Sequence, residues 1–297
     1  MHLLGNCGII REEKVQGPTI NQAAKIDLSQ TQVLPRAQGA LKVRAKRRGD
    51  ASVLADLRTA GSLKALFPHT SSSALDVVFL NTAGGMTGGD VFEIDAQVDA
   101  EARLTLTTQA AERIYGAVDP APALMTTKLQ AGHRARIDWL PQETILFDRA
   151  ALRRKLDVDL AEDASFLMVE PLVFGRKTMG EIVQSAMFAD DVRVRRNGAL
   201  IFADAVRLSG HIHATLQATA TAQGNIAMAS VLYAAPDAEA HLKALQALMP
   251  QTGGVSLIHD GVLFARLIAP DSFLLRQALV PVVAHLQGGP LPKTWML

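Results

Sequence analysis

Between residues 71 and 181, apolar and polar side chains alternate in one short run after another. A period of two is typical of half-buried strands, and Asp, Gly and Pro residues mark turns between the runs. Because this spacing is typical of antiparallel all-β packing, we predict a mainly β protein. The strands predicted in this region cover residues 75–80, 91–98, 104–107, 124–129, 134–139, 155–160 and 166–169.

Further strands are predicted on both sides of this region. Residues 41–48 alternate almost to their end, which places their cations on one face of a strand. Residues 192–202 are predicted to form a hairpin with Asn197-Gly198 as its two-residue turn. Residues 255–258 and 261–268 are predicted to pair around a turn at Asp260-Gly261.

Two helices are predicted near the C-terminus, where apolar residues recur at helical spacing. The first begins at Asp237 and is stopped by Pro250. The second begins at Asp271, is expected to bend at Pro281 and ends at Gly288-Gly289. No interior linker is evident, so we predict one continuous β-rich unit with these two helices packed on it.

Composition narrows the class of protein. The chain has 297 residues, 48% of them hydrophobic, and a net charge of +1. We expect a loosely ordered arm over residues 1–35 and one β-rich domain over residues 36–297. Neither a membrane span nor a secretory signal is expected. The balanced charge disfavours nucleic acid as a partner, and the single cysteine, Cys7, fits a reducing cytoplasm.

Residues 81–90 read Asn-Thr-Ala-Gly-Gly-Met-Thr-Gly-Gly-Asp, with four glycines in six residues between two predicted strands. Such a density of glycine indicates backbone at positive φ or very close packing. A phosphate-binding loop is disfavoured, because a helix follows the dinucleotide fingerprint and a Gly-Lys-Ser/Thr ending marks the P-loop. Here a strand follows, so nucleotide binding is not expected.

This loop is the first of five sequence blocks that together resemble the urease accessory protein UreD (UreH) family. Ala83 stands where that family usually has proline, and Lys293 stands where it usually has arginine. One block alone would be weak support, whereas five in the family's order are strong support. The blocks are residues 81–90, 106–115 (ending in Tyr115), 139–148 (Trp-Leu-Pro-Gln-Glu-Thr-Ile-Leu-Phe-Asp), 170–181 (containing Gly-Arg and Gly-Glu) and 291–295 (Leu-Pro-Lys-Thr-Trp).

The resemblance implies stacked antiparallel sheets in a β-helix-like arrangement with about two C-terminal helices. It implies a non-enzymatic, cytoplasmic protein that binds the urease apoprotein and recruits UreF and the GTPase UreG for nickel insertion. No tightly bound cofactor is expected, although nickel could pass in transit. The residues expected to shape the fold or to dock a partner are Gly84, Gly85, Gly88, Gly89, Asp90, Tyr115, Trp139, Arg176, Glu181 and Trp295.

The end of the chain has two alternative interpretations. The apolar tip around Trp295 follows a Gly-Gly-Pro break. It either folds back into a pocket of its own chain or anchors to a partner, and the sequence does not choose between them.

Candidate metal ligands are few. His211 and His213 are expected on one side of a strand, where they could form a bidentate pair, although a solvent-facing polar pair is the favoured interpretation. The other histidines are scattered and point to no site. A second hypothesis, drawn from the family's role, is a polar passage for a hydrated divalent cation. Its lining carboxylates would be Asp90, Asp148, Glu170 and Glu181.

Two alternative functions remain at this point. A β-rich hydrolase would use a pair of carboxylates such as Glu143 and Glu181, although internal pairing of Glu143 and of Arg176 is favoured. Neither a G-x-S-x-G elbow nor an H-E-x-x-H helix is present. A nucleic-acid binder would use the cations of residues 42–48, which lack the interleaved aromatic residues needed for base stacking.

Overall fold

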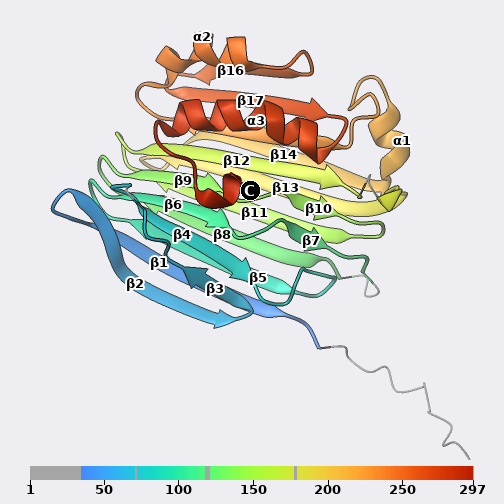
Figure 1. Cartoon of the computed structure of the whole chain (residues 1–297), viewed down its shortest axis with the longest axis horizontal. Helices are drawn as coiled ribbons and strands as arrows, with labels where there is room; N and C mark the ends of the chain where they lie inside the picture. Colours follow the sequence, from blue (N-terminus) through green and yellow to red (C-terminus); the bar gives the residue numbers. More distant parts are fainter. Residues whose placement is uncertain (1–34, 71, 118–120, 177–178, 297) are drawn as a thin grey trace, which may run out of the picture. The chain divides into compact units, whose positions relative to one another are not determined.

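Two long β-sheets face each other, and the chain passes between them at each corner to wind a β-solenoid of about four turns (Figure 1). This computed structural model describes residues 35–296 except 71, 118–120 and 177–178. The predicted N-terminal arm therefore lies outside the described residues, apart from residue 35. The residues from Arg36 onward cluster as one unit.

The strands of each sheet follow one another in a regular spatial order. Sheet A contains, in order, β14 (Ala199–His211), β13 (Ser185–Arg196), β11 (Ala151–Leu160), β8 (Ala123–Ala131), β5 (Val91–Val98), β1 (Gln38–Arg48) and β2 (Ala51–Gly61). Sheet B contains β16 (Gly253–His259), β17 (Val262–Ala269), β15 (Ala227–Ala234), β12 (Ser165–Phe174), β9 (Arg136–Leu140), β6 (Arg103–Thr108), β4 (Leu75–Asn81) and β3 (Leu63–Leu66). Two short strands extend sheet B: β10 (Thr144–Leu146) pairs with β12, and β7 (Glu112–Ile114) pairs with β10.

The mainly β class and the β-helix-like stacking of the sheets are confirmed, but the expected antiparallel pairing of strands holds only at the ends of the stack. The inner strands β1, β5, β8, β11 and β13 pair in parallel, as do β4, β6, β9 and β12. Antiparallel pairs occur at β1–β2, β3–β4, β13–β14, β12–β15, β15–β17 and β16–β17. Each turn of the solenoid repeats the same path, so equivalent strands of successive turns run in the same direction. Alternation reports which face is buried and says nothing about strand direction.

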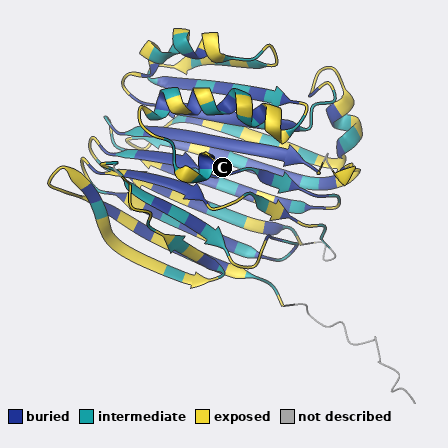
Figure 2. Ribbon diagram, in the orientation of Figure 1, coloured by how far each residue is buried: buried dark blue, intermediate teal, exposed yellow. Residues whose placement is uncertain are grey.

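The main core fills the space between the two sheets and takes apolar residues from both of them. Figure 2 shows buried and exposed positions alternating along several of the strands. Strand β1 shows the pattern directly, because Leu41, Val43 and Ala45 are buried while the cations between them are exposed. A second core lies where the helices α2 (Ala238–Leu248) and α3 (Ser272–Gln287) cover the end of sheet B. The predicted C-terminal helices are thus confirmed, and they pack as a separate layer.

Local sequence features explain several element boundaries. The Asp271 side chain accepts a hydrogen bond from the Leu274 amide at 2.9 Å and caps the start of α3. Gly288 ends α3 at φ +67°. Asn197 and Gly198 both have positive φ, at +50° and +79°, as a tight primed hairpin turn requires. Both predicted strand pairs, β13–β14 and β16–β17, are confirmed.

Candidate functional site

Four of the sequence blocks meet at the corners where sheet B passes into sheet A. Successive corners stack through backbone hydrogen bonds. The Tyr115 amide donates to the Met86 carbonyl at 2.8 Å, and the Phe147 amide donates to the Ile114 carbonyl at 3.0 Å. The Gly175 amide then donates to the Leu146 carbonyl at 2.8 Å. Residues far apart in the sequence therefore form one continuous column along the solenoid.

The side chains of this column stack as the backbone does. The Tyr115 and Phe147 rings meet edge to face with centroids 5.1 Å apart. The Arg176 guanidinium lies 4.4 Å from the Phe147 ring centre on the next corner, a distance suited to a cation–π contact. Arg176 also pairs with Glu181 at 2.8 Å. We call Tyr115, Phe147, Arg176 and Glu181 the corner column.

The glycine loop is shaped by close contact with the corner column. Gly85 has φ +150°, and a Cβ placed there would lie 2.4 Å from Cε2 of Tyr115 and 2.6 Å from the Arg113 carbonyl oxygen. The Tyr115 hydroxyl donates to the Gly84 carbonyl at 3.3 Å. Gly84 and Gly89 also have positive φ, while Gly88 is buried within the loop. The prediction of positive φ and close approach is therefore confirmed at Gly85.

Asp90 closes the glycine loop from within. Its side chain is only 4% exposed, and its two oxygens accept hydrogen bonds from the Thr87 amide at 2.8 Å and the Ala37 amide at 2.7 Å. The second bond ties the loop to the entry of β1. A carboxylate that accepts hydrogen bonds from two backbone amides holds the loop in a fixed geometry.

At the other end of the column, Asp148 and Glu181 come together. The Asp148 amide donates to Oε1 of Glu181 at 3.3 Å, and Oδ1 of Asp148 accepts from the Ser185 amide at 3.0 Å. Around them Met179 and Ile182 are 72% and 49% exposed. This end of the column therefore presents charged and apolar groups together at the surface.

A hollow of about 380 Å³ lies next to this end of the column. Its lining is mainly apolar and comes from the segment after β12, from helix α1 (Ile212–Gln217) and from the residues before β15 and α3. The lining includes Phe174, Glu181, Ile182, Val183, Leu216, Ile226 and Pro270. Helix α1 was not predicted, because its six residues are too few to show a helical period.

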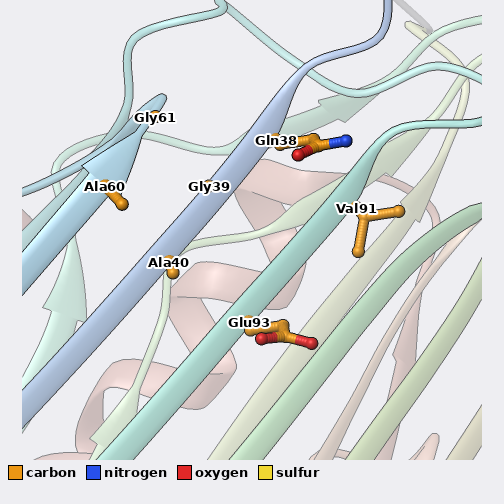
Figure 3. A pocket seen from close by; sticks show the side chains of 7 residues that line it. All are labelled: Gln38, Gly39, Ala40, Ala60, Gly61, Val91 and Glu93. Atoms are coloured by element: carbon orange, nitrogen blue, oxygen red, sulfur yellow. The ribbon is translucent and has the colours of Figure 1, made fainter.

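A second hollow of about 380 Å³ lies over the outer face of sheet A, between β2, β1 and β5 (Figure 3). Gly39, Ala40, Ala60 and Gly61 form its floor, and Glu93 is its one charged side chain. A floor of small residues with a single carboxylate does not assemble a set of groups for catalysis or metal binding.

Trp139 and Glu170, which the sequence placed among the site candidates, lie in the core instead of at the corners. The Trp139 indole donates to Oε1 of Glu170 at 2.6 Å, and Arg154 donates to Oε2 at 2.5 Å. Arg154 also forms a two-pronged pair with Asp190 at 3.0 and 2.6 Å. Burial raises the pKa of Glu170, and the Arg154 charge opposes that rise. This cluster joins the two sheets from inside the solenoid.

Glu112 is a titratable residue of the site that sequence reasoning missed. Asn81 of the glycine loop donates to its Oε1 at 3.0 Å, and both residues line a small hollow of about 130 Å³ with Gly84 and Gly85. Burial raises the pKa of Glu112 to about 7. Its position inside the 106–115 block was the available clue.

The C-terminus folds back onto its own chain, which decides between the two alternatives for Trp295. This side chain is 2% exposed, and its indole donates to the Leu140 carbonyl at 3.0 Å. The Arg276 guanidinium lies 5.2 Å from the Trp295 ring centre and also donates to Gln142 and Glu143. Glu143 therefore pairs internally with Arg276, and Arg176 pairs internally with Glu181, as favoured from the sequence.

The predicted placement of His211 and His213 on one strand face is wrong. His211 is the last residue of β14, whereas His213 belongs to helix α1. The strand ends here because Ile212 is fully buried and the amides of Ile212 and His213 bond to the segment before β13. Within the described ranges, no group of three or more Asp, Glu, His or Cys side chains is arranged to hold a metal ion.

The cations of β1 lie in a charge pattern that crosses the outer face of sheet A. In register, Lys42 of β1 neighbours Asp95, which neighbours Lys128, then Asp157, then Arg193. Opposite charges alternate along this row, so neighbouring strands attract each other. The row lacks the uniform positive charge that a phosphate backbone requires.

No helix in the part of the chain that the structure describes combines the length and apolar content needed to span a bilayer.

The fold and the stacked corners define a β-solenoid protein whose sequence motifs build one column along its edge. A family model described as "UreD urease accessory protein" matches residues 37–296. The chain therefore belongs to the UreD family of urease accessory proteins.

Curated relatives agree with this assignment. A urease accessory protein UreD from Roseobacter denitrificans is 46% identical over 263 residues, covering 89% of this chain and 96% of the relative. The protein of the same name from Rhizobium leguminosarum bv. viciae is 44% identical, with 88% and 96% covered. That from Ruegeria pomeroyi is 45% identical, with 86% and 100% covered.

Proposed function

We propose that this protein is a non-enzymatic, cytoplasmic adaptor of urease maturation. It binds the urease apoprotein, recruits UreF and through it the GTPase UreG, and so helps Ni²⁺ enter the urease active site. The observation that carries the proposal is the UreD family match over residues 37–296. The named partners come from the family resemblance of the sequence blocks.

The exposed end of the corner column supports a role in protein contact. Ile182 and Met179 are exposed beside the mainly apolar hollow, and the Arg176 side chain is 48% exposed over Phe147. Apolar groups with an arginine among them are typical of the centre of a protein interface. We therefore assign partner docking to this surface.

Co-purification tests the proposal. The full chain is co-expressed with the urease subunits, UreF and UreG, and the retained proteins and their nickel content are measured. Wild type should retain urease and UreF, whereas Ile182→Lys should retain at least tenfold less of one of them. Leu200→Lys is the matched control, because Leu200 is 56% exposed on β14. Failure of wild type to retain any partner would refute the function, and equal retention by both variants would refute the surface.

Nickel transit forms the second part of the proposal. Asp148 and Glu181 are only partly buried, whereas Asp90 and Glu170 are buried. The hydrated ion would therefore meet Asp148 and Glu181 before the other two. Weak oxygen ligands suit transit because they bind a borderline ion without trapping it.

The charge of Glu181 tests this part. Glu181→Gln keeps a hydrogen-bonding group of the same shape beside Arg176 and removes the charge. Urease matured with this variant should contain less nickel while the accessory complex still assembles. Equal nickel content with wild type and variant would remove Glu181 from the route.

The absence of enzymatic activity is also part of the proposal. The two carboxylates of the hydrolase alternative are tied to different cations, Glu143 to Arg276 and Glu181 to Arg176. Their internal pairing supports a structural role for each. Turnover of a panel of esters and amides by the purified protein, abolished by Glu143→Gln or Glu181→Gln, would overturn this interpretation.

A further inference from the structure

Two histidines that are 44 residues apart in the sequence meet between the C-terminal helices. Helix α2 carries His241 and helix α3 carries His285, and Nδ1 of the first lies 3.0 Å from Nε2 of the second. The rings are nearly perpendicular, with centroids 5.0 Å apart. Both histidines are partly buried, so neither ring is closed off from solvent.

A carboxylate stands behind one of the two imidazoles. Oδ2 of Asp237 lies 3.4 Å from Nε2 of His241, and Oδ1 of Asp237 accepts a hydrogen bond from the Tyr233 hydroxyl at 2.9 Å. A carboxylate on the far nitrogen favours a proton there, so Nδ1 of His241 presents its lone pair toward His285. A carboxylate of this kind typically orients a metal-ligating histidine and strengthens it as a ligand.

We propose that His241 and His285 form a two-imidazole binding site for a divalent first-row transition ion, of the class Ni²⁺, Cu²⁺ or Zn²⁺. Imidazole nitrogen suits these ions. With metal–nitrogen bonds of about 2.0–2.1 Å, the observed 3.0 Å separation corresponds to an angle of about 90° at the ion. Small rotations of both rings aim the lone pairs at the ion, and water completes its coordination.

The charges around the pair are compatible with a bound cation. Asp237 contributes a negative charge beside His241. The Arg136 guanidinium lies 5.8 Å from the ring centre of Tyr233, and its charge is paired with Asp138 at 2.9 Å. The carboxylate of Asp237 therefore attracts a divalent ion at this pair, and the charge of Arg136 is offset by Asp138.

This site is separate from the corner column and does not depend on the proposed function. With two protein nitrogens and water as ligands, binding is exchangeable and follows the order in which Cu²⁺ binds more tightly than Ni²⁺ or Zn²⁺. An ion held by both histidines links α2 to α3. It therefore stabilises the helical layer by an amount that grows with the logarithm of the ratio between its free concentration and the dissociation constant.

The test is metal titration of the purified full-length chain without urease or other partners. Cu²⁺ and Ni²⁺ are titrated separately at pH 7.5 against a chromophoric chelator, and bound Cu²⁺ is examined by electron paramagnetic resonance. Wild type should bind one ion with two nitrogen ligands. His285→Gln should lose that ion, and Asp237→Asn should bind it about 10–100-fold more weakly.

His259→Gln is the matched control, since His259 is exposed on β16 and contacts the backbone of Asp260. It should bind like wild type. Wild type that binds no ion, or an ion retained equally by His285→Gln, would overturn the proposal and leave a simple imidazole–imidazole hydrogen bond.

If His285→Gln fails to fold, carbethoxylation of the wild-type protein replaces it. Ni²⁺ should protect His241 and His285 from the reagent but leave His259 reactive, as measured by mass spectrometry. Equal modification of all three with and without Ni²⁺ would overturn the site. Because no urease is present, this result is independent of whether the protein acts in urease maturation.

Discussion

Arg154 holds the charged cluster inside the solenoid, and removing its charge tests how that cluster is balanced. The residue is 7% exposed and donates to both Asp190 oxygens, to Glu170 and, at 3.3 Å, to Thr144. In Arg154→Met, two buried carboxylates lose their shared cation. Breaking a buried ion pair from one side costs about 3–5 kcal/mol, a large fraction of the stability of a typical domain.

The pH dependence of the loss identifies its cause. Burial raises the pKa of Glu170, and the Arg154 charge opposes that rise, so the pKa rises further in the variant. A carboxyl with a raised folded-state pKa destabilises the fold as pH increases from its unfolded value of about 4.3 through the folded value. The deficit of Arg154→Met should therefore be largest near pH 7.5 and smaller at pH 5.

Urea unfolding at both pH values measures this deficit. Arg153→Met is the matched control, because Arg153 is the exposed neighbour on the same strand, and it should change stability by less than about 0.5 kcal/mol. If Arg154→Met were as stable as Arg153→Met, or if its deficit were the same at pH 5 and pH 7.5, uncompensated buried carboxylates could not be the cause.

Three further predictions concern the glycine loop, the C-terminus and the titrating carboxyl. Gly85→Ala should lower the free energy of unfolding by about 1–3 kcal/mol in thermal and urea unfolding. Its φ of +150° strains an alanine backbone, and the new Cβ would lie 2.4 Å from the Tyr115 ring. Gly254→Ala, where the new Cβ faces open space, should cost less than about 1 kcal/mol, and equal losses would contradict the argument. Trp295→Ala should lower the free energy of unfolding by about 3–5 kcal/mol, because the variant loses the buried ring and its hydrogen bond. Met296→Ala is the control, since Met296 is 71% exposed, and it should be nearly neutral in the same assay. A similarly small loss for Trp295→Ala would refute the docked C-terminus. Because the pKa of Glu112 is raised from 4.5 to about 7, folding favours its protonated form and wild-type stability should fall as pH rises through this window. Glu112→Gln should remove on the order of 2 kcal/mol of that fall between pH 5 and pH 8, and unchanged pH dependence would show that the carboxyl is solvated.

Local features that depend on neighbouring residues were predictable. The burial of β1 on alternate positions follows from its residue pattern alone, and the Asn197-Gly198 turn follows from the tolerance of both residues for positive φ. The Asp271 cap likewise follows from the spacing between a carboxylate and nearby free amides. The five motif blocks indicated the family because their order along the chain is itself local information.

Features that depend on how the solenoid winds were not predictable in the same way. Strand direction was missed, because a parallel and an antiparallel strand bury the same alternate residues. The raised pKa of Glu112 depends on burial by a loop about thirty residues away. The contact between His241 and His285 requires α2 and α3 to pack together, which no spacing in the sequence reveals.

The sequence by itself determined which residues face inward, where the chain turns and to which family it belongs, since each depends on short-range chemistry or on ordered motifs. Only the tertiary structure decided that Tyr115, Phe147 and Arg176 stack on successive corners and that Trp295 docks on its own chain. The physical reason for the stacking is the pitch of the solenoid, which brings residues about thirty positions apart to the same edge once per turn. The docking of Trp295 joins residues 155 positions apart, so it depends on how the end of the chain packs against the finished solenoid.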